Sequence, residues 1–389
     1  MINPFLAEHL FEFPVRPLLI EFEAQVFDTV ARALGGLGLG IGLVTPRFSM
    51  MGLLPVPAKL IPVINDLPGV RAVHADLQSR ALVKVPSFLD TSLFFSTAES
   101  RLVLEADLAF DQGWTGEGVK TAVIDTGIDP SHPQLQGAEW ESVIRLPVRE
   151  VLDENGHGSH VSSTAMGRIQ RVDPPGLFAQ GVSQSPLLSI KALGRGIGTG
   201  FTSEIVNAMA LALERGAKVV NMSLGSEECQ GGCRLCPECR AVTLLTDSGI
   251  LVAIAAGNSG PDGDTIGCPG CTPEAITVAA VDRDGVVPDF SSRGGPKFPG
   301  KPDVAAPGVD IFSGTARGSF IDIGDAAANV GYAAISGTSM ATPHVAGLLA
   351  LLKHRNPNLT SADFKATLDT VGSPFNTLSG RGVPKWSQF

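Results

Sequence analysis

Short apolar runs alternate with longer helical segments from about residue 105 onward, and this alternation limits the possible fold more than any other feature of the chain. Five runs are apolar along most of their length and predict buried strands at 119–125, 187–193, 217–225, 249–258 and 275–282. Helical periodicity predicts helices at 157–167, 203–216 and 343–355. Strands that are buried on both faces belong to parallel sheets with helices on either side. The sequence therefore predicts a three-layer α/β domain with a mostly parallel sheet over residues 105–389.

The first 85 residues follow a different order and predict a separate small α+β domain of the ferredoxin-like kind. Its expected elements are strands at 17–25, 49–56, 69–76 and 79–85 and helices at 26–34 and 58–67. Both helices are expected on one face of the sheet, and the last two strands are expected to pair around a short turn. The looser, polar stretch 86–104 is interpreted as a linker between the two domains.

Charge and hydropathy exclude two classes of partner. The net charge is −10 and no basic stripe offsets it, which argues against nucleic acid as a partner. The apolar run 33–44 is too short and too rich in glycine to cross a bilayer, so no membrane partner is expected. The N-terminus has no basic segment followed by an apolar one. This slightly favours a cytoplasmic protein, or an extracellular one if a leader has been removed.

Four residues with catalytic potential lie where predicted strands end or helices begin. Asp125 closes a strand, His157 begins a helix, Asn258 ends a strand, and Ser339 begins the last long helix. A helix N-terminus favours developing negative charge, which suits a nucleophile at Ser339. Each residue alone is also explained as a turn former or a cap, and His160 competes with His157 for any role as a base.

Six stretches together resemble the subtilisin-like serine proteases, in the order in which that family carries them. They are "AVIDTGIDPSHP", "NGHGSHVSSTAMG", "VVNMSLG", "AAGNSGP", "KPDVAAPG" and "GTSMATPHVAG". The resemblance implies a serine endopeptidase in which Ser339 attacks the substrate, His157 is the general base and Asp125 orients it. It also implies an oxyanion hole formed by the side chain of Asn258 and the backbone N–H of Ser339. Such an enzyme needs no cofactor for catalysis.

The resemblance extends to the substrate site and to the N-terminal domain. It assigns seven residues to the walls and floor of the S1 pocket: Ser223, Leu224, Gly225, Ala255, Ala256, Gly257 and Gly267. Small residues there leave room for a large apolar P1 side chain. The neighbouring Glu227 and Glu228 are interpreted as a solvated acidic loop, with a preference for basic residues as the alternative. Residues 1–85 resemble the inhibitory prodomain of the family, which implies self-cleavage in or near residues 84–101.

All six cysteines lie between residues 229 and 271, where the family pattern does not require them. Cys236 and Cys239, together with Cys268 and Cys271, have the spacing of a structural zinc site with four thiolate ligands. Three disulfides that also include Cys229 and Cys233 are the equal alternative. Neither arrangement is expected to take part in catalysis.

A calcium site near the catalytic histidine is in doubt. Gln134 stands where relatives carry an aspartate, and Asp173 is the only carboxylate in the loop that follows. Calcium binds to several oxygen ligands at once, so this sequence favours loss of the site.

Two alternatives to a simple protease stay open. One is a catalytically silent protease fold that binds peptides in its groove. The other is a protease whose S1 pocket is gated by a metal held by the cysteines. The expected partners are protein or peptide substrates and the chain's own N-terminal domain.

Overall fold

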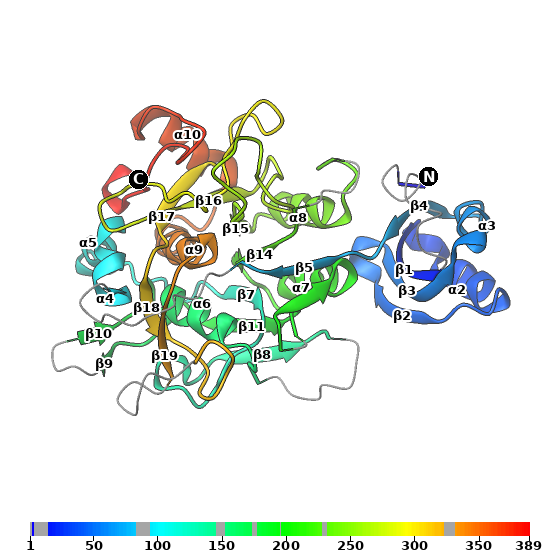
Figure 1. Cartoon of the computed structure of the whole chain (residues 1–389), viewed down its shortest axis with the longest axis horizontal. Helices are drawn as coiled ribbons and strands as arrows, with labels where there is room; N and C mark the ends of the chain where they lie inside the picture. Colours follow the sequence, from blue (N-terminus) through cyan, green and yellow to red (C-terminus); the bar gives the residue numbers. More distant parts are fainter. Residues whose placement is uncertain are drawn as a thin grey trace.

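The computed structural model describes residues 2–3, 15–82, 94–144, 152–172, 177–194, 196–227, 232–322 and 331–389. Figure 1 shows two parts, a small N-terminal domain and a larger domain, with strand β5 (Gln78–Ala81) reaching from the first into the second. The larger domain holds the residues with catalytic potential. The smaller one is placed against its helices.

A seven-stranded sheet forms the centre of the larger domain. Its strands in spatial order are β17 (Val304–Pro307), β16 (Ile276–Val281), β15 (Leu251–Ala255), β13 (Val219–Met222), β7 (Thr121–Asp125), β11 (Leu187–Lys191) and β8 (Glu139–Ser142). Every pair of neighbours is parallel. All strands except the edge strand β8 are buried along their whole length, so the prediction of a mostly parallel, covered sheet is confirmed.

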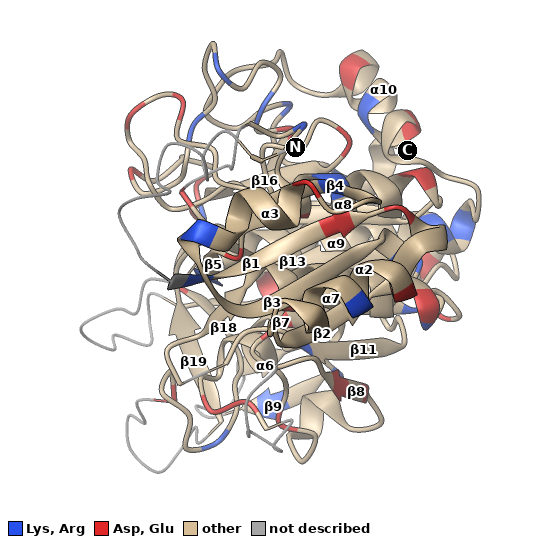
Figure 2. Ribbon diagram, turned by 90° about the vertical axis from the view of Figure 1, so that its right-hand side faces the viewer, with Lys and Arg blue, Asp and Glu red and all other residues tan. Residues whose placement is uncertain are grey.

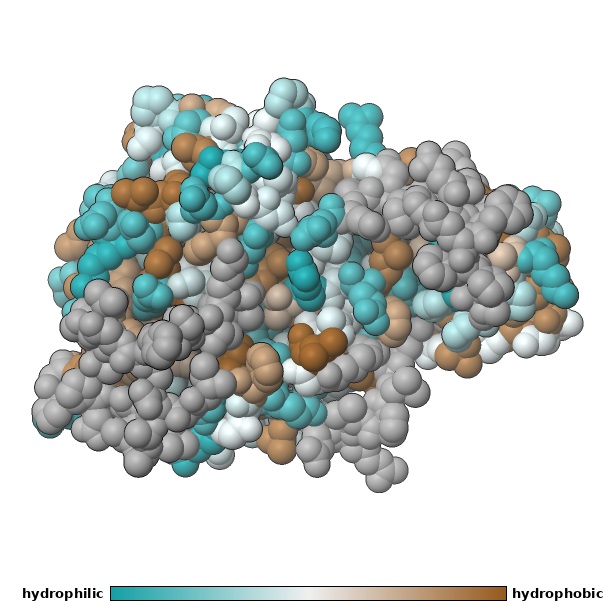
Figure 3. Space-filling model, viewed as in Figure 1, coloured by the Kyte–Doolittle hydropathy of each residue, from teal (hydrophilic) through white to brown (hydrophobic). Residues whose placement is uncertain are grey.

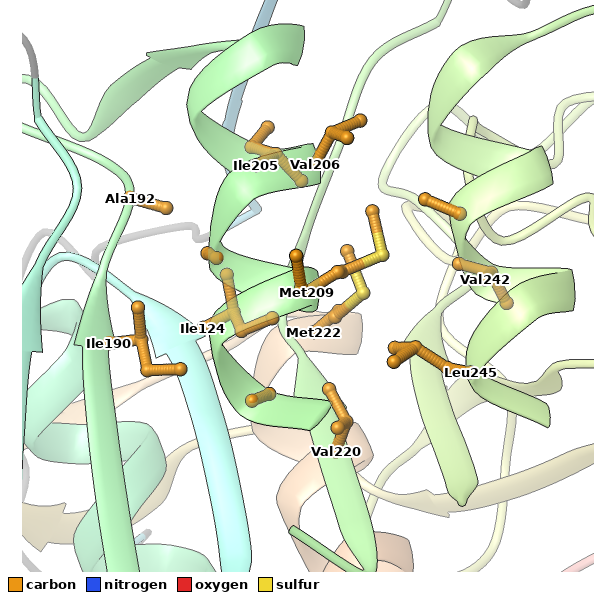
Figure 4. Close-up of a cluster of buried hydrophobic side chains, with 14 of the residues drawn as sticks. Ile124, Ile190, Ala192, Ile205, Val206, Met209, Val220, Met222, Val242 and Leu245 are labelled. Carbon is orange, nitrogen blue, oxygen red and sulfur yellow. The ribbon is translucent and has the colours of Figure 1, made fainter. Parts of the chain in front are cut away.

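Helices cover both faces of this sheet because successive strand residues point to opposite sides. Val220 and Met222 of β13 pack with Met209 and Val242 on one face, and Figure 4 shows this cluster. Val219 of the same strand packs on the opposite face. The helices of the larger domain are α4 (Thr97–Ser100), α5 (Ala106–Asp111), α6 (His157–Met166), α7 (Thr202–Glu214), α8 (Pro237–Asp247), α9 (Thr338–Arg355) and α10 (Ser361–Val371).

Short sheets and turns complete the larger domain. One sheet joins β9 (Gln170–Val172) to β10 (Leu177–Ala179), and another joins β19 (Tyr332–Ile335), β18 (Ile311–Gly314) and β6 (Phe95–Ser96). A third places β5 between β12 (Thr199–Phe201) and β14 (Leu224–Gly225). Single 3-10 turns are η5 (Arg101–Leu104), η6 (Pro133–Leu135) and η7 (Trp386–Gln388).

The N-terminal domain is an antiparallel sheet with two helices on one face, as the ferredoxin-like prediction requires. The strand order is β2-β3-β1-β4. Its elements are β1 (Val15–Phe22), η1 (Ala24–Val26), α2 (Phe27–Gly36), β2 (Ile41–Thr45), η2 (Pro46–Phe48), β3 (Met50–Pro57), η3 (Ala58–Leu60), α3 (Ile61–Asn65) and β4 (Val70–Ala75). Figure 2 shows α2 and α3 on the outer side of this sheet.

Three sequence-based expectations need correction. Strand β2 was not expected, because its glycine-rich surroundings lower the strand propensity. Strands β4 and β5 do not pair with each other, since β4 bonds to β1 and β5 bonds to the larger domain. The segment 94–104 is not a linker, because β6, α4 and η5 occupy it.

The inner face of the N-terminal sheet packs on helices α7 and α8. Leu19, Phe48 and Met50 join the same apolar cluster as Met209 and Val242. No helix within the described parts of the chain is long and apolar enough to cross a membrane. Figure 3 shows small hydrophobic groups scattered among hydrophilic residues on the described part of one face.

Candidate active site

The carboxylate and the imidazole that the sequence singled out are in direct contact. Asp125 is the last residue of β7 and His157 is the first residue of α6, and both are fully buried. Asp125 Oδ1 lies 2.7 Å from His157 Nδ1 and also accepts a hydrogen bond of 2.7 Å from the backbone N–H of Thr126. This contact fixes the proton of His157 on Nδ1 and leaves Nε2 as the acceptor.

A second buried carboxylate holds the start of α6 in place. Asp153 Oδ1 accepts hydrogen bonds of 2.7 Å from Thr126 Oγ1 and from the N–H of Gly156, and Oδ2 accepts one of 2.8 Å from the N–H of Ser159. Burial raises the pKa of Asp153 above its usual value, and these hydrogen bonds offset only part of that rise. The sequence analysis missed this residue. An acidic residue just before a helix start is the signal that would have identified it.

Ser339 occupies the first turn of α9, which packs against α6. Its Oγ donates a hydrogen bond of 2.9 Å to the carbonyl of Ser223, and Ser223 Oγ donates one of 2.8 Å to the carbonyl of Ser339. His157 Nε2 is buried and has no hydrogen-bond partner among the described residues. A neutral ring nitrogen without a proton is a hydrogen-bond acceptor.

Asn258 follows β15 and presents its side-chain amide beside Ser339. Its Oδ1 lies 3.0 Å from the backbone nitrogen of Thr338 and 3.0 Å from Thr338 Oγ1, both of which are donors. Because the oxygen is engaged by Thr338, the NH₂ group is the part of the amide that is directed away from the helix. The sequence analysis assigned no role to Thr338. The structure shows that it orients Asn258.

A peptide strand already lies in the groove beside these residues. In β5, Ala81 pairs with Leu224, Arg80 pairs with Gly225, and Ser79 pairs with Gly200 on the other side. The next residue, Leu82, lines a cavity of about 30 Å³ together with Gly225, Gly257, Asn258 and Gly267. A Cβ atom on Gly225 would lie 3.3 Å from Leu82 Cδ1 and 2.9 Å from the carbonyl of Cys268, so glycine keeps this pocket open.

The structure places the seven expected pocket residues in two groups. Gly225, Gly257 and Gly267 line the cavity. Ser223, Leu224, Ala255 and Ala256 are not among the described residues that line it. Ser223 contacts Ser339, Leu224 pairs with β5, and Ala256 packs against the cysteines.

The acidic residue at the rim of the pocket is engaged by exposed partners. Glu227 Oε1 accepts hydrogen bonds of 3.1 Å from Arg80 Nη2 and of 3.2 Å from Ser259 Oγ. The ion pair with Arg80 is exposed to solvent on both sides, and such pairs contribute little. Glu228 lies outside the described residues.

Two further histidines, His160 on α6 and His344 on α9, are bonded within the fold. His160 Nε2 donates to the carbonyls of Ile311 and Ala333, and burial lowers its pKa to about 3. His344 donates from Nδ1 to the carbonyl of Met340 and accepts at Nε2 from Ser100, and burial lowers its pKa to about 4. Both rings are neutral at pH 7, as a structural role requires.

The cysteines differ from both sequence interpretations. Cys233 and Cys271 form a disulfide, with a Cα–Cα distance of 6.4 Å, within the usual range for such a bond. Cys236, Cys239 and Cys268 are buried and form no disulfide with another cysteine in the described part of the chain. In this structure, therefore, Cys271 does not join the other three as a thiolate, and the three-disulfide alternative is not met either. Cys229 lies outside the described residues.

The side-chain amide of Gln134 forms hydrogen bonds with the backbone. Its Oε1 accepts from the N–H of Gly314 at 3.1 Å and its Nε2 donates to the carbonyl of Arg168 at 3.2 Å. This oxygen therefore already accepts a hydrogen bond. Asp173 lies outside the described residues.

Comparison with known proteins gives consistent matches. The profile of the Subtilase family (Peptidase_S8) matches residues 116–377. The serine protease AprX of Bacillus subtilis is 33% identical over 333 residues, which cover 80% of this chain and 71% of that protein. The subtilisin of Bacillus pumilus is 35% identical over 286 residues, covering 72% of this chain and 94% of that protein.

A solved structure shows the same fold. Fervidolysin of Fervidobacterium pennivorans, described as a keratinolytic enzyme related to subtilisin, matches with a TM-score of 0.76 at 22% identity. The match covers 96% of this chain and 60% of the fervidolysin chain. It therefore includes both the larger domain and the N-terminal domain.

Proposed function

The chain belongs to the subtilase family and is a serine endopeptidase, and from this premise we propose that Asp125, His157 and Ser339 form its catalytic triad. The observation that carries the proposal is the bond of 2.7 Å between Asp125 Oδ1 and His157 Nδ1, next to an unpartnered, buried Nε2 among the described residues. We further propose that residues 1–82 act as an inhibitory prodomain that the enzyme removes from itself.

Each step of the reaction uses a group whose position has been described. His157 Nε2 takes the proton from Ser339 Oγ as the oxygen attacks the scissile carbonyl. Asp125 keeps the ring in the required tautomer and stabilises its cationic form. The resulting oxyanion accepts hydrogen bonds from Asn258 Nδ2 and from the backbone N–H of Ser339. His157 then protonates the leaving amine, and water hydrolyses the acyl-enzyme.

We propose that substrates bind as an extended strand, in the way that β5 does. The backbone of β14 and that of β12 would then flank the peptide, so that main-chain hydrogen bonds provide most of the affinity. The pocket formed by Gly225, Gly257 and Gly267 would accept the P1 side chain. Leu82 of the N-terminal domain lies against these glycines, which supports a preference for a large apolar P1 residue.

The pairing of β5 also supports a particular processing bond. If Arg80 and Ala81 occupy the P3 and P2 positions, then Leu82 is the P1 residue and the bond from Leu82 to Val83 is cleaved. This bond lies directly before the region 84–101 that the sequence suggested. The N-terminal domain would then leave the cleft only after the cut. Until it leaves, its strand blocks the site where a substrate would bind, which explains the inhibition.

Contacts between the two domains support the role of inhibitor. Asp76 accepts hydrogen bonds of 2.8 Å from the N–H and 2.7 Å from the Oγ of Ser203, at the start of α7. A carboxylate at a helix N-terminus is favoured by the helix dipole. Glu21 forms an ion pair with Arg240 of α8. These contacts persist after a cut at residue 82, so docking does not depend on the covalent link.

The test refolds the wild-type chain beside Ser339→Ala, with Ser336→Ala from the same turn as the matched control. We expect the wild type and Ser336→Ala to yield fragments 1–82 and 83–389 by intact mass and to digest casein, whereas Ser339→Ala stays whole. If wild type and Ser339→Ala both remain intact and inactive, the chain is a silent peptide-binding module instead. A cut elsewhere in the wild type would refute the assignment of Leu82 as the P1 residue.

A further inference from the structure

The three thiols outside the disulfide meet at one buried point beside the S1 pocket. Cys236 caps α8, Cys239 lies in the first turn of that helix, and Cys268 belongs to the loop between β15 and β16. Each is at most 2% exposed. The sulfur of Cys268 is 3.0 Å from that of Cys236 and 3.5 Å from that of Cys239. All three sulfurs lie within 4.8 Å of one another.

This arrangement is poorly explained by a further disulfide. A disulfide joins two sulfurs, so Cys268 could bond to only one of its two close neighbours among the described residues. A metal ion, in contrast, uses all three sulfurs at once. In a tetrahedral zinc site with Zn–S bonds of about 2.3 Å, neighbouring sulfurs are about 3.8 Å apart. The Cys239–Cys268 distance of 3.5 Å is close to this value, and the Cys236–Cys268 distance of 3.0 Å is shorter than it.

The surroundings suit thiolate ligands and a soft ion. The first turn of α8 directs its backbone N–H groups toward Cys236, which favours negative charge there. Ala256 and Ile266 pack around the sulfurs and shield them from water. Soft thiolates select zinc over hard cations such as calcium and magnesium.

A fourth sulfur lies within reach. Cys271 Sγ is 3.6 Å from Cys239 Sγ, although Cys271 is bonded to Cys233 in this structure. A dithiol reductant can supply two electrons and two protons to this disulfide, which gives two thiols while the reductant becomes a disulfide. Cys271 is then available as a fourth ligand, and each bound thiol releases its proton to solvent.

We propose that Cys236, Cys239 and Cys268 bind one Zn²⁺ ion, with Cys271 as the fourth ligand when the Cys233–Cys271 bond is reduced. The site is structural, because four thiolates leave no open position. It lies outside the catalytic residues and is independent of the proposed triad.

The zinc site braces the S1 pocket through the backbone. The N–H of Ser226 donates to the carbonyl of Cys268 at 2.9 Å, and the N–H of Cys268 donates to the carbonyl of Ser226 at 2.9 Å. Ser226 and Gly267 both line the pocket. Fixing Cys268 with a metal therefore fixes one wall of the pocket, so metal loss is expected to loosen substrate binding there.

The test uses the full-length chain in the Ser339→Ala background, which prevents self-digestion, and compares Cys236→Ser and Cys268→Ser with Cys233→Ser. After expression with added zinc and purification under reductant, we expect one zinc per chain in the parent and in Cys233→Ser by elemental analysis. Cys236→Ser and Cys268→Ser should lose it. Replacement of zinc by Co²⁺ should give a thiolate-to-metal charge-transfer band only in the parent and in Cys233→Ser.

Three results would overturn the proposal. The first is the absence of zinc and of the cobalt band from both the parent and Cys233→Ser. The second is retention of zinc in Cys268→Ser. The third is a disulfide among Cys236, Cys239 and Cys268, found by peptide mapping under the same conditions. Thermal unfolding of Cys268→Ser separates loss of metal from failure to fold. If Cys268→Ser unfolds cooperatively and holds no zinc, the result supports the site. If Cys268→Ser is unfolded from the start, the zinc content of Cys236→Ser and the cobalt band decide whether the site exists.

Discussion

The catalytic rim and the docking surface of the N-terminal domain both bury polar groups, but they do so in different ways. At the rim, Asp125, Asp153 and Asn258 bond to groups of the same domain, mostly at the ends of strands and the starts of helices. At the docking surface, Glu21 and Asp76 bond to groups of the other domain. The first arrangement is fixed when the larger domain folds. The second can be undone without disturbing the reacting groups.

The two regions also differ in their apolar contacts. Docking places Leu19, Phe48 and Met50 against α7 and α8, and burial of such a side chain contributes about 1.5–3 kcal/mol. Three such side chains and the polar contacts can keep the domain bound after a cut. The reacting groups at the rim are positioned by the hydrogen bonds described above. The comparison predicts that rim substitutions change turnover and docking substitutions change inhibition.

The largest effect on the rim side is expected from Asp125→Asn. An amide at this position keeps the shape but favours the wrong tautomer of His157, which typically lowers kcat by about 10⁴-fold. The rate of hydrolysis of a chromogenic peptide by the separated 83–389 chain measures it. Asp129→Asn, four residues further along and partly exposed, is the control and should stay near the parent rate. A loss of less than tenfold in Asp125→Asn would exclude this carboxylate from the triad.

A smaller effect is expected from Asn258→Ala, which removes one donor to the oxyanion. Loss of a donor of this kind lowers kcat by about 10²–10³-fold, a magnitude established on subtilisin and carried over here. The value of KM should change little, because the donor acts mainly on the transition state. Steady-state kinetics separate the two parameters. A rise in KM at constant kcat would place Asn258 in substrate binding instead.

On the docking side, Glu21→Gln is expected to weaken inhibition by the released N-terminal domain by about tenfold, since charge-assisted hydrogen bonds contribute about 1.5–3 kcal/mol. Burial raises the pKa of Glu21, but the hydrogen bond and charge of His74 and the charge of Arg240 outweigh it and lower the pKa below 4.5. Of these partners only Arg240 belongs to the larger domain, so the contribution of Glu21 to docking comes from the part of the lowering that Arg240 causes, and it is present where the carboxylate is ionised. It is lost as the pH falls through the lowered value.

Inhibition constants measured between pH 7 and pH 3 with a pH-tolerant peptide substrate test this dependence. The parent should lose affinity toward acid pH more steeply than Glu21→Gln. Glu23→Gln, two residues along the chain, is the control. Equal pH profiles for the parent and Glu21→Gln would show that another group controls docking at acid pH.

The smallest effect is expected from Thr338→Val, which removes a hydrogen bond that orients the amide of Asn258 while the backbone N–H still holds its oxygen. One neutral hydrogen bond contributes about 0.5–1.5 kcal/mol, so kcat should fall by about two- to tenfold. In the Asn258→Ala background the same substitution should have almost no further effect. Full additivity of the two substitutions in a double-mutant cycle would separate Thr338 from the oxyanion hole.

The sequence predicted the central sheet well because strands that are apolar on both faces have few other interpretations. It also placed Asp125, His157 and Ser339 at a strand end and at helix starts, which is where the structure has them, whereas β15 ends at Ala255 and Asn258 lies in the loop after it. It failed for β5, whose partners are edge strands of the other domain rather than its neighbour in the chain. Local pattern carries no information about such a choice of partner.

The contributions of Asp153 and Thr338 were missed for a related reason. Asp153 accepts hydrogen bonds from the backbone at the start of α6 and from Thr126, and Thr338 donates to the side chain of Asn258. Spacing likewise grouped the cysteines as two C-x-x-C pairs, whereas the structure joins Cys233 to Cys271 across the loop. Three-dimensional proximity decides the partner of Thr338 and the partner of Cys233.

Reaction of the self-processed enzyme with a fluorophosphonate, followed by peptide mapping, tests most directly whether the described groups act together. Such a reagent bonds to a serine that a neighbouring base activates. We expect one label per chain, on Ser339, with labelling abolished in His157→Ala and unchanged in His160→Asn if that variant folds. A folded, processed enzyme that carries no label, or carries it on another residue, would contradict the account.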